Sequence, residues 1–259
     1  MYVSPDLILY IVYHDEASKQ IAAKYEKYSW AKLLYIESTK YLESDAYRVL
    51  KTREDEWKDK QFVGVIKYSF EEKTTFFDFE HLCKEQEADV FTFVGPESHS
   101  PDTQGVSMIR TARRCHQYFP TIWSHILITR MGLNETDVFS EEIPAFYSNF
   151  WIAKTQLFKE YLRIYGIVQE IMEKDELIRP ILYQNASYFQ HIDTDRLTQI
   201  MGVPYYPYHP FVMERLPCLV FWLLKAKIRL VTNEERIRIQ ERFLKKAYPN
   251  GYPDSKNSI

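Results

Sequence analysis

Glycine is scarce in this chain, since only 7 of its 259 residues are glycine. Loops that cradle phosphates depend on glycine, because a residue without a Cβ lets the backbone approach the ligand closely. Neither common pattern of this kind, GxGxxG or GxxxxGK[ST], occurs in the sequence. A nucleotide bound by this protein would therefore need other contacts for its phosphates.

Cysteine pairs and an excess of positive charge are also missing. The three cysteines, Cys83, Cys115 and Cys218, are widely spaced and form no CxxC pair. They indicate free thiols in or near the core, and neither a disulfide framework nor a zinc site. The formal net charge of −3 argues against nucleic acid as a partner, because neutralising phosphates requires a clustered basic surface.

No apolar run is long enough to cross a membrane. The run from Leu7 to Tyr13 follows no positively charged segment and ends at the polar residue His14, so it matches neither a signal peptide nor a membrane span. We therefore expect a cytoplasmic protein. Residues 216–231 join an apolar segment to three basic side chains, which would allow association with a membrane surface, although a buried helix is favoured.

Short apolar runs alternate with helical stretches in the first part of the chain. Strands are predicted over residues 7–13, 32–36, 62–66 and 90–94, because these runs are rich in β-branched and aromatic residues. A helix capped by Ser44 or Asp45 is expected over about residues 43–57. This alternation predicts an α/β fold with a Rossmann-like, mainly parallel sheet flanked by helices.

The second half of the chain is more helical. We predict a largely helical region over residues 104–131, a strand within 143–153 and a helix over 155–174, followed by a helical C-terminal part. No internal repeat or linker is visible, so residues 1–247 are expected to form one domain, with a flexible tail over 248–259.

Polar side chains follow the first predicted strand. His14 and Asp15 come directly after the run over 7–13, and open parallel sheets bind nucleotides beyond the carboxyl ends of their strands. Asp15 could equally cap the helix that follows. Asn149 lies within a run of aromatic residues, where a buried amide is either a structural hydrogen-bonding group or a ligand contact.

A second polar group lies in the aromatic segment over residues 205–217. This segment holds His209, Glu214 and Arg215 among three prolines, directly before an apolar run. If residues 211–224 form a helix, His209 lies just before its first turn, and the other two lie one turn in. The alternative is a core helix with an internal ion pair, because charges beside buried surface need a partner.

The order of five short patterns resembles one family of enzymes. The patterns are YLESxxY over 41–47, FVGVIKYSF over 62–70, ADVFTF over 88–93, YSNFWIAK over 147–154 and MERL over 213–216. Their succession resembles that of capsular-polysaccharide-type glycosyltransferases, and also that of glycosyltransferases of algal and large-DNA-virus type. The resemblance spans roughly residues 7–227.

The resemblance implies a GT-A-like fold that holds a nucleotide-sugar donor across the carboxyl edge of the first strands, with a glycan acceptor entering from the other half. By position it implies that Asn149 contacts the sugar. Lys67 and Ser69 stand where the family has His and Arg, so one fixed guanidinium is missing. The residues expected to bind the donor and its diphosphate are His14, Asp15, Glu43, Ser44, Lys67, Tyr68, Ser69, His209 and Arg215.

Glycosyl transfer requires the departing nucleoside diphosphate to be stabilised by a divalent metal or by fixed donors. No Asp-x-Asp pattern follows a predicted strand, since Asp193-Thr194-Asp195 comes late, and Asp78-Phe79-Glu80 is the nearest acidic alternative. We therefore assign no metal ligands, disfavour bound Mn²⁺ or Mg²⁺, and expect the diphosphate to be neutralised by Lys67, His209 and Arg215.

An inverting transfer also needs a carboxylate that accepts the proton of the attacking hydroxyl. Glu214 is our first choice and Asp78 the second. If Glu214 pairs with Arg215, its pKa would be lowered, which suits an orienting role better than proton abstraction. Aromatic side chains such as Trp151 suit stacking on sugar rings, although most aromatic residues are core residues.

The sequence thus predicts a glycosyltransferase that transfers a sugar from a nucleotide sugar, with a UDP-sugar favoured, to a glycan. The alternative is a non-catalytic carbohydrate- or partner-binding protein on the same fold, which the missing Asp-x-Asp pattern favours. The sequence does not identify the sugar, the acceptor or the stereochemical course of transfer. It also does not indicate the oligomeric state.

Overall fold

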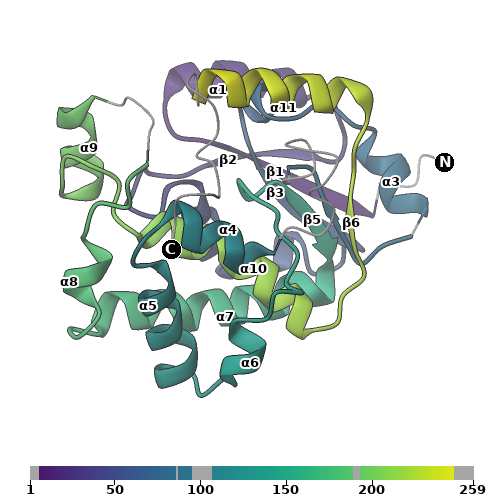
Figure 1. The fold of residues 1–259 in the computed structure, drawn as a ribbon. Coiled ribbons are helices and arrows are strands. Elements are labelled where there is room, and N and C mark those ends of the chain that lie inside the picture. Colours follow the sequence, from purple (N-terminus) through teal and green to yellow (C-terminus); the bar gives the residue numbers. More distant parts are fainter. Residues whose placement is uncertain (1–5, 86, 95–106, 189–192, 248–259) are drawn as a thin grey trace.

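A six-stranded sheet forms the centre of the protein (Figure 1). The computed structural model describes residues 6–85, 87–94, 107–188 and 193–247. The strands are β1 (Leu7–Tyr13), β2 (Ala31–Tyr35), β3 (Phe62–Lys67), β4 (Val90–Thr92), β5 (Trp151–Lys154) and β6 (Ile228–Leu230). Their order across the sheet is β2-β1-β3-β5-β4-β6.

The sheet is mixed but mostly parallel. β1 pairs in parallel with β2 and β3, and β4 pairs in parallel with β6. β5 lies between β3 and β4 and runs antiparallel to both. The prediction of an α/β fold with a mainly parallel sheet flanked by helices is confirmed, and the arrangement is compatible with a Rossmann-like fold.

The chain changes direction across the sheet at β1. It passes from β1 to β2 on one side and then to β3 on the other side, so the carboxyl ends of β1 and β3 flank a topological switch point. β5 runs the other way and pairs its first residue, Trp151, with Val65 near the end of β3. The start of β5 therefore reaches the same edge of the sheet as the ends of β1 and β3.

Hydrophobic cores lie on both faces of the sheet, because successive residues of a strand point to opposite sides. Tyr10 and Val12 of β1 belong to the larger core, which α7 (Thr155–Lys174) and α10 (His209–Leu223) complete. Leu9 and Ile11 belong to the smaller core beside α1 (Glu16–Ala22) and α3 (Phe79–Glu85). Figure 1 shows α1 and α11 on one side of the sheet and α7 and α10 on the other.

Shorter helices complete the described parts of the chain. They are η1 (Ala23–Tyr25), η2 (Leu42–Ser44), α2 (Asp45–Lys51), η3 (Glu54–Glu56), η4 (Phe70–Glu72), α4 (Met108–Cys115), α5 (Phe119–Ser124), the π-helix η7 (His125–Arg130), α6 (Glu135–Val138), α8 (Arg179–Leu182), α9 (Thr194–Met201) and the longer α11 (Glu234–Ala247). The bounds of β1 and α7 agree with the prediction to the residue, because each has a clear apolar pattern.

The predicted strand within residues 143–153 is wrong over most of its length. Only Trp151–Lys154 forms β5. Ser148 and Asn149 have positive φ angles of 66° and 55°, which no extended strand contains. An isolated bridge between Ser107 and Pro144 is the other β-type contact of this segment.

Two predicted helices are interrupted. The region over 104–131 forms α4, α5 and η7, and His116 between α4 and α5 is extended with φ −142°; residues 104–106 lie outside the described part. The helix expected over 43–57 divides into η2, α2 and η3. The predicted cap is wrong, because the Ser44 side chain makes no capping bond and Asp45 pairs with Arg48 at 2.9 Å.

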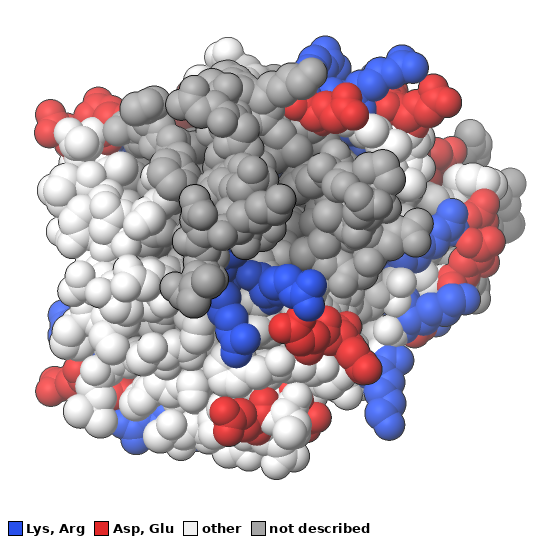
Figure 2. Space-filling model, viewed as in Figure 1, with Lys and Arg blue, Asp and Glu red and all other residues white. Residues whose placement is uncertain are grey.

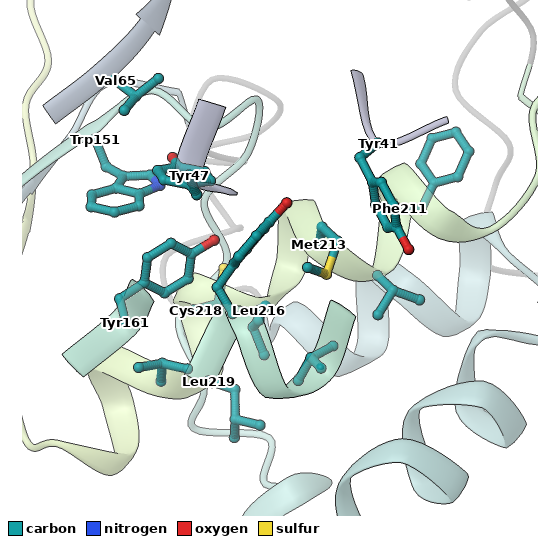
Figure 3. Packing of buried hydrophobic residues seen from close by; sticks show 14 of the residues in the cluster. Tyr41, Tyr47, Val65, Trp151, Tyr161, Phe211, Met213, Leu216, Cys218 and Leu219 are labelled. Carbon is teal, nitrogen blue, oxygen red and sulfur yellow. The ribbon is translucent and has the colours of Figure 1, made fainter. Parts of the chain in front are cut away.

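The apolar half of α10 lies in the core (Figure 3). Leu216, Cys218, Leu219 and other apolar residues of this helix are buried, so they are not exposed for contact with a membrane surface. Within the described ranges, none of the helices combines the length and the hydropathy needed to cross a membrane. The three cysteines are free thiols, two of them buried, as predicted. The predicted tail over 248–259 lies outside the described residues.

Candidate functional site

The carboxyl edge of the sheet carries charged and polar side chains at the switch point between β1 and β3. Lys67, the last residue of β3, places its Nζ 2.7 Å from Glu43 Oε1 in η2. We refer to the following residues as the switch-point cluster: His14, Glu43, Lys67, Tyr68, Lys73, Ser148, Asn149 and Glu214. They come from five separate segments of the chain, so the cluster exists only in the folded protein.

Lys67 and Glu43 form a partly exposed ion pair, with side-chain exposures of 32% and 26%. Burial alone would raise the pKa of Glu43, but the charge and hydrogen bond of Lys67 lower it overall. Burial likewise opposes the charge of Lys67, whereas Glu43 raises the pKa of this ammonium overall. Both groups are therefore charged at neutral pH, and the pair places a fixed ammonium at the end of β3.

His14 lies at the end of β1, directly across the switch point from Lys67. Its ring contacts the edge of the Tyr68 ring, with centroids 5.4 Å apart. Burial lowers the pKa of His14, and the positive charge of Lys67 adds to this effect while Asp15 opposes it. His14 is therefore neutral at neutral pH and can offer one ring N–H as a hydrogen-bond donor.

Three segments hold the start of β5 in place. Glu214 Oε1 in α10 accepts a hydrogen bond of 2.6 Å from the backbone amide of Ser148. Lys73 Nζ donates to Ser148 Oγ at 3.0 Å. Asn149 Nδ2 donates to Ser44 Oγ in η2, also at 3.0 Å. These bonds join α10, the loop after η4 and η2 to the edge where the switch point lies.

The backbone at this edge is strained. Ser148 and Asn149 both have positive φ, and so does Leu42 with φ 51° directly before Glu43. Side-chain-bearing residues in this region cost about 1–3 kcal/mol each and cluster at functional sites. Asn149 is 7% exposed, and its Oδ1 finds no hydrogen-bond partner among the described residues. A buried acceptor of this kind is costly unless a ligand or water supplies a donor.

Arg215 is held within the protein next to the cluster. It is 4% exposed, and its Nη1 lies 3.2 Å from Glu214 Oε2 and donates to the carbonyl of Phe211 at 3.1 Å. Its guanidinium also lies over the rings of Phe119 and Tyr147. The interpretation of residues 205–217 as a core helix with an internal ion pair fits this geometry.

His209 is fully buried. It is the first residue of α10 instead of preceding the helix. Its ring packs against Tyr183 and Tyr41, with centroids 4.8 and 5.6 Å away. Burial, together with the charge of Lys40, lowers the pKa of His209 to about 3. The structure therefore gives His209 neither the charge nor the access that neutralising a diphosphate requires.

Asp15 and Ser69 have local roles. Asp15 Oδ1 accepts a 2.7 Å hydrogen bond from the amide of Ser18 and caps α1, as the helix-capping interpretation predicted. Its other oxygen lies 4.0 Å from Arg196 in α9. Ser69 is half-buried and precedes η4, where its carbonyl accepts the amide of Glu72.

Asp78 and Trp151 lie outside the switch-point cluster. Asp78 is exposed, and its Oδ1 accepts the amide of His81 at 3.0 Å at the start of α3. Trp151 is fully buried and stacks on Tyr47 at a centroid distance of 5.4 Å (Figure 3). The packing of Trp151 leaves no face open for a sugar ring.

The structure adds two cationic residues that the sequence patterns did not reveal, Lys73 and Arg196. Each lies near the site only because of a contact with a residue distant in sequence, Ser148 for Lys73 and Asp15 for Arg196. No pattern of neighbouring residues could have identified either one. Asp193 and Asp195 begin α9, where the Asp193 side chain accepts the amide of Asp195 at 2.9 Å. The late Asp-x-Asp pattern is thus a helix start. Among the residues described, no three or more His, Cys, Asp or Glu side chains form a group that could hold a metal ion.

Basic and acidic side chains lie next to each other on the face drawn in Figure 2, within the described part of the surface. Comparisons of the chain with protein-family models, with curated proteins and with solved structures found no match.

Proposed function

We propose that this protein is a glycosyltransferase with a GT-A-like fold, which transfers a sugar from a nucleotide-sugar donor to a glycan acceptor, with a UDP-sugar favoured. The observation that carries the proposal is the position of Lys67 and His14 on either side of the β1/β3 switch point. Ligands of open α/β sheets bind in the crevice outside the carboxyl ends of the strands at such a point.

In this proposal the diphosphate of the donor lies beside Lys67. As the bond between the anomeric carbon and the phosphate oxygen breaks, its electron pair stays with that oxygen, and negative charge develops there. A fixed ammonium stabilises this charge more in the transition state than in the ground state. The neutral imidazole of His14 and the hydroxyl of Tyr68 are neighbouring donors for the phosphate oxygens.

Glu214 is the proposed proton acceptor for an inverting transfer. Its side chain is 22% exposed, and the Ser148 amide fixes one carboxylate oxygen. The oxygen of the acceptor hydroxyl forms the new bond to the anomeric carbon while Glu214 takes the hydroxyl proton. Asn149 Oδ1 is the proposed acceptor for a sugar hydroxyl, because it is buried at the same edge.

The second candidate function is a non-catalytic carbohydrate- or partner-binding protein. Both oxygens of Glu214 already have partners, the Ser148 amide and Arg215. A carboxylate with both oxygens engaged in this way suits an orienting role. The two candidates differ in turnover and agree in ligand binding.

The test begins with nucleotide binding. Thermal-shift and calorimetric titrations against UDP, GDP, CMP and their sugars, each with and without Mn²⁺, should give a saturable response to at least one nucleotide. Transfer or hydrolysis of the bound sugar is then measured for the wild type and for Lys67→Ala and Glu43→Ala. Lys154→Ala is the matched control, because Lys154 pairs with Asp89 at the same 2.7 Å at the opposite edge of the sheet.

The outcomes separate the candidates. Turnover that Lys67→Ala and Glu43→Ala lose and Lys154→Ala keeps would support the transferase. Saturable binding without turnover of any donor would favour the binding protein. A protein that responds to no nucleotide or nucleotide sugar would overturn the proposed function.

A further inference from the structure

Lys73 is a second lysine at the switch point that the proposed chemistry does not yet use. It follows η4, six residues after Lys67 in the sequence. Its Nζ donates to Ser148 Oγ at 3.0 Å, and the amide of the same serine donates to Glu214. The Lys73 ammonium therefore lies at the strained start of β5, beside the proposed proton acceptor.

The charges around Lys73 place it in the same electrostatic unit as Lys67. Burial is the largest effect and lowers the pKa of Lys73, while the carboxylates of Glu214 and Glu43 oppose that shift and Lys67 adds to it. Glu43 thus interacts with both ammonium groups, and its short ion pair is with Lys67. A poorly solvated ammonium gains more from an added anion than a surface lysine does, because the interaction is less screened.

We infer that Lys67 and Lys73 together form a binding site for a pyrophosphate-type group, in which both ammonium groups contribute positive charge. This inference rests on the proposed function, because it assigns the second half of the diphosphate site to a named residue. Two lysines supply neutralising charge in a sequence that has neither a GxGxxG nor a GxxxxGK[ST] pattern. The ligand class is a nucleoside diphosphate or free pyrophosphate.

The experiment is calorimetric titration with inorganic pyrophosphate, UDP and uridine. It compares the wild type with Lys73→Met, which keeps an unbranched side chain one atom shorter and removes the charge, with Lys73→Arg, and with the control Lys154→Met. We expect Lys73→Met to weaken pyrophosphate and UDP binding by about tenfold or more, the typical effect of losing a charged hydrogen bond. Uridine binding should not change, Lys73→Arg should recover part of the loss, and Lys154→Met should behave as the wild type.

Folding is checked by the thermal transition of each variant, and Lys73→Gln replaces the methionine variant if that one does not fold. Equal affinity of the wild type and the uncharged variant for pyrophosphate would overturn the inference. If that equality holds while the wild type binds UDP, the inference fails and the proposed function survives. If the wild type binds pyrophosphate through Lys73 but binds no nucleotide, the proposed function fails and the anion site stands. A wild type that binds neither pyrophosphate nor a nucleotide overturns both.

Discussion

The two edges of the sheet carry ion pairs of the same length in different surroundings. At the carboxyl edge Lys67 lies 2.7 Å from Glu43, and at the amino edge Lys154 lies 2.7 Å from Asp89. Their side-chain exposures are also similar, at 32% and 26% for the first pair and 39% and 31% for the second. The distance between the charged atoms and the exposed side-chain fraction therefore do not distinguish a candidate site from a structural contact in this protein.

The backbone around each pair makes the difference. At the amino edge, Asp89 Oδ2 also accepts the amide of Lys227 at 2.8 Å, and its carbonyl accepts the amide of Lys154 at 2.9 Å. At the carboxyl edge, Ser148 and Asn149 are held at positive φ and Asn149 Oδ1 is without a partner in the described structure. The amino-edge pair satisfies its own hydrogen bonds, whereas the carboxyl edge keeps strain and an unused acceptor that favour a ligand site.

The largest expected effect comes from Glu214→Gln. If Glu214 accepts the proton of the acceptor hydroxyl, this variant should lower kcat by about 10²–10⁴-fold, the usual contribution of general base catalysis. Nucleotide affinity should stay within about twofold, because the amide keeps an oxygen for Ser148. Steady-state kinetics and calorimetry on the same preparation check this; a full kcat would leave Glu214 as a structural contact and make the two edges alike.

Lys67→Met should lower kcat by about 10²–10³-fold, since it removes a charge that stabilises the leaving diphosphate. Lys154→Met at the amino edge should leave kcat unchanged. The measurement is initial rates at saturating donor, with thermal transitions to verify folding. Equal losses in the two variants would mean that the choice of edge is mistaken.

His209→Ala tests the fully buried imidazole at the start of α10. The ring is fully buried between Tyr41 and Tyr183, so its removal leaves a cavity, and we expect unfolding to become easier by about 2–4 kcal/mol. Nucleotide affinity should stay unchanged wherever the protein is folded. Denaturant titration measures the free energy of unfolding, and calorimetry measures nucleotide affinity. Unchanged stability together with lost nucleotide affinity would indicate that His209 belongs to the binding site.

Relieving backbone strain at positive-φ residues should have a smaller effect. Lys225 also has positive φ, 53°, at the end of α10, so Lys225→Gly should stabilise the protein by about 1 kcal/mol and leave ligand binding intact. Ser148→Gly would release similar strain but remove the hydroxyl that binds Lys73. We expect pyrophosphate to bind more weakly to Ser148→Gly but not to Lys225→Gly. Equal affinity of the two variants for pyrophosphate would mean that the strained backbone at Ser148 does not mark a ligand site.

The smallest effect is a pH dependence shared by both edges. The pKa of Glu43 is lowered, since Lys67 outweighs the effect of burial, and the hydrogen bond from Lys154 lowers the pKa of Asp89. A lowered folded-state pKa contributes stability above the unfolded-state value, and this is lost as pH falls through the folded-state value. Glu43→Gln and Asp89→Asn should each reduce acid destabilisation by less than about 1 kcal/mol, measured by denaturant titration between pH 7 and acid. A rise in stability of the wild type on acidification would contradict both assignments.

Much of the fold could be predicted because its signals are local. The apolar run of β1 and the periodic pattern of α7 give their bounds directly, and the order of the first strands predicts the parallel part of the sheet. The short strand β5 was harder to predict from the sequence. Its aromatic run over 143–153 has strand-forming composition, but the turn at Ser148 and Asn149 depends on bonds to Glu214, Lys73 and Ser44, which come from other segments.

The candidate site was predicted in part for the same reason. Lys67, Glu43 and His14 follow from strand ends and short patterns, and the fold brings them to one edge. Lys73 carries no pattern, and its place appears only when the loop after η4 packs beside β5. His209 and Trp151 have the chemistry of ligand contacts but are fully buried, a property that depends on packing with Tyr41, Tyr183 and Tyr47.

The sequence by itself determined the alternation of strands and helices, the free thiols and the polar residues at the ends of β1 and β3, because periodicity and residue type act over a few neighbouring positions. The tertiary structure decided which polar groups meet at the switch point and which are enclosed in the core. Those outcomes depend on contacts between segments as distant as Ser44 and Asn149, and such contacts form only when the whole sheet and its helices pack together.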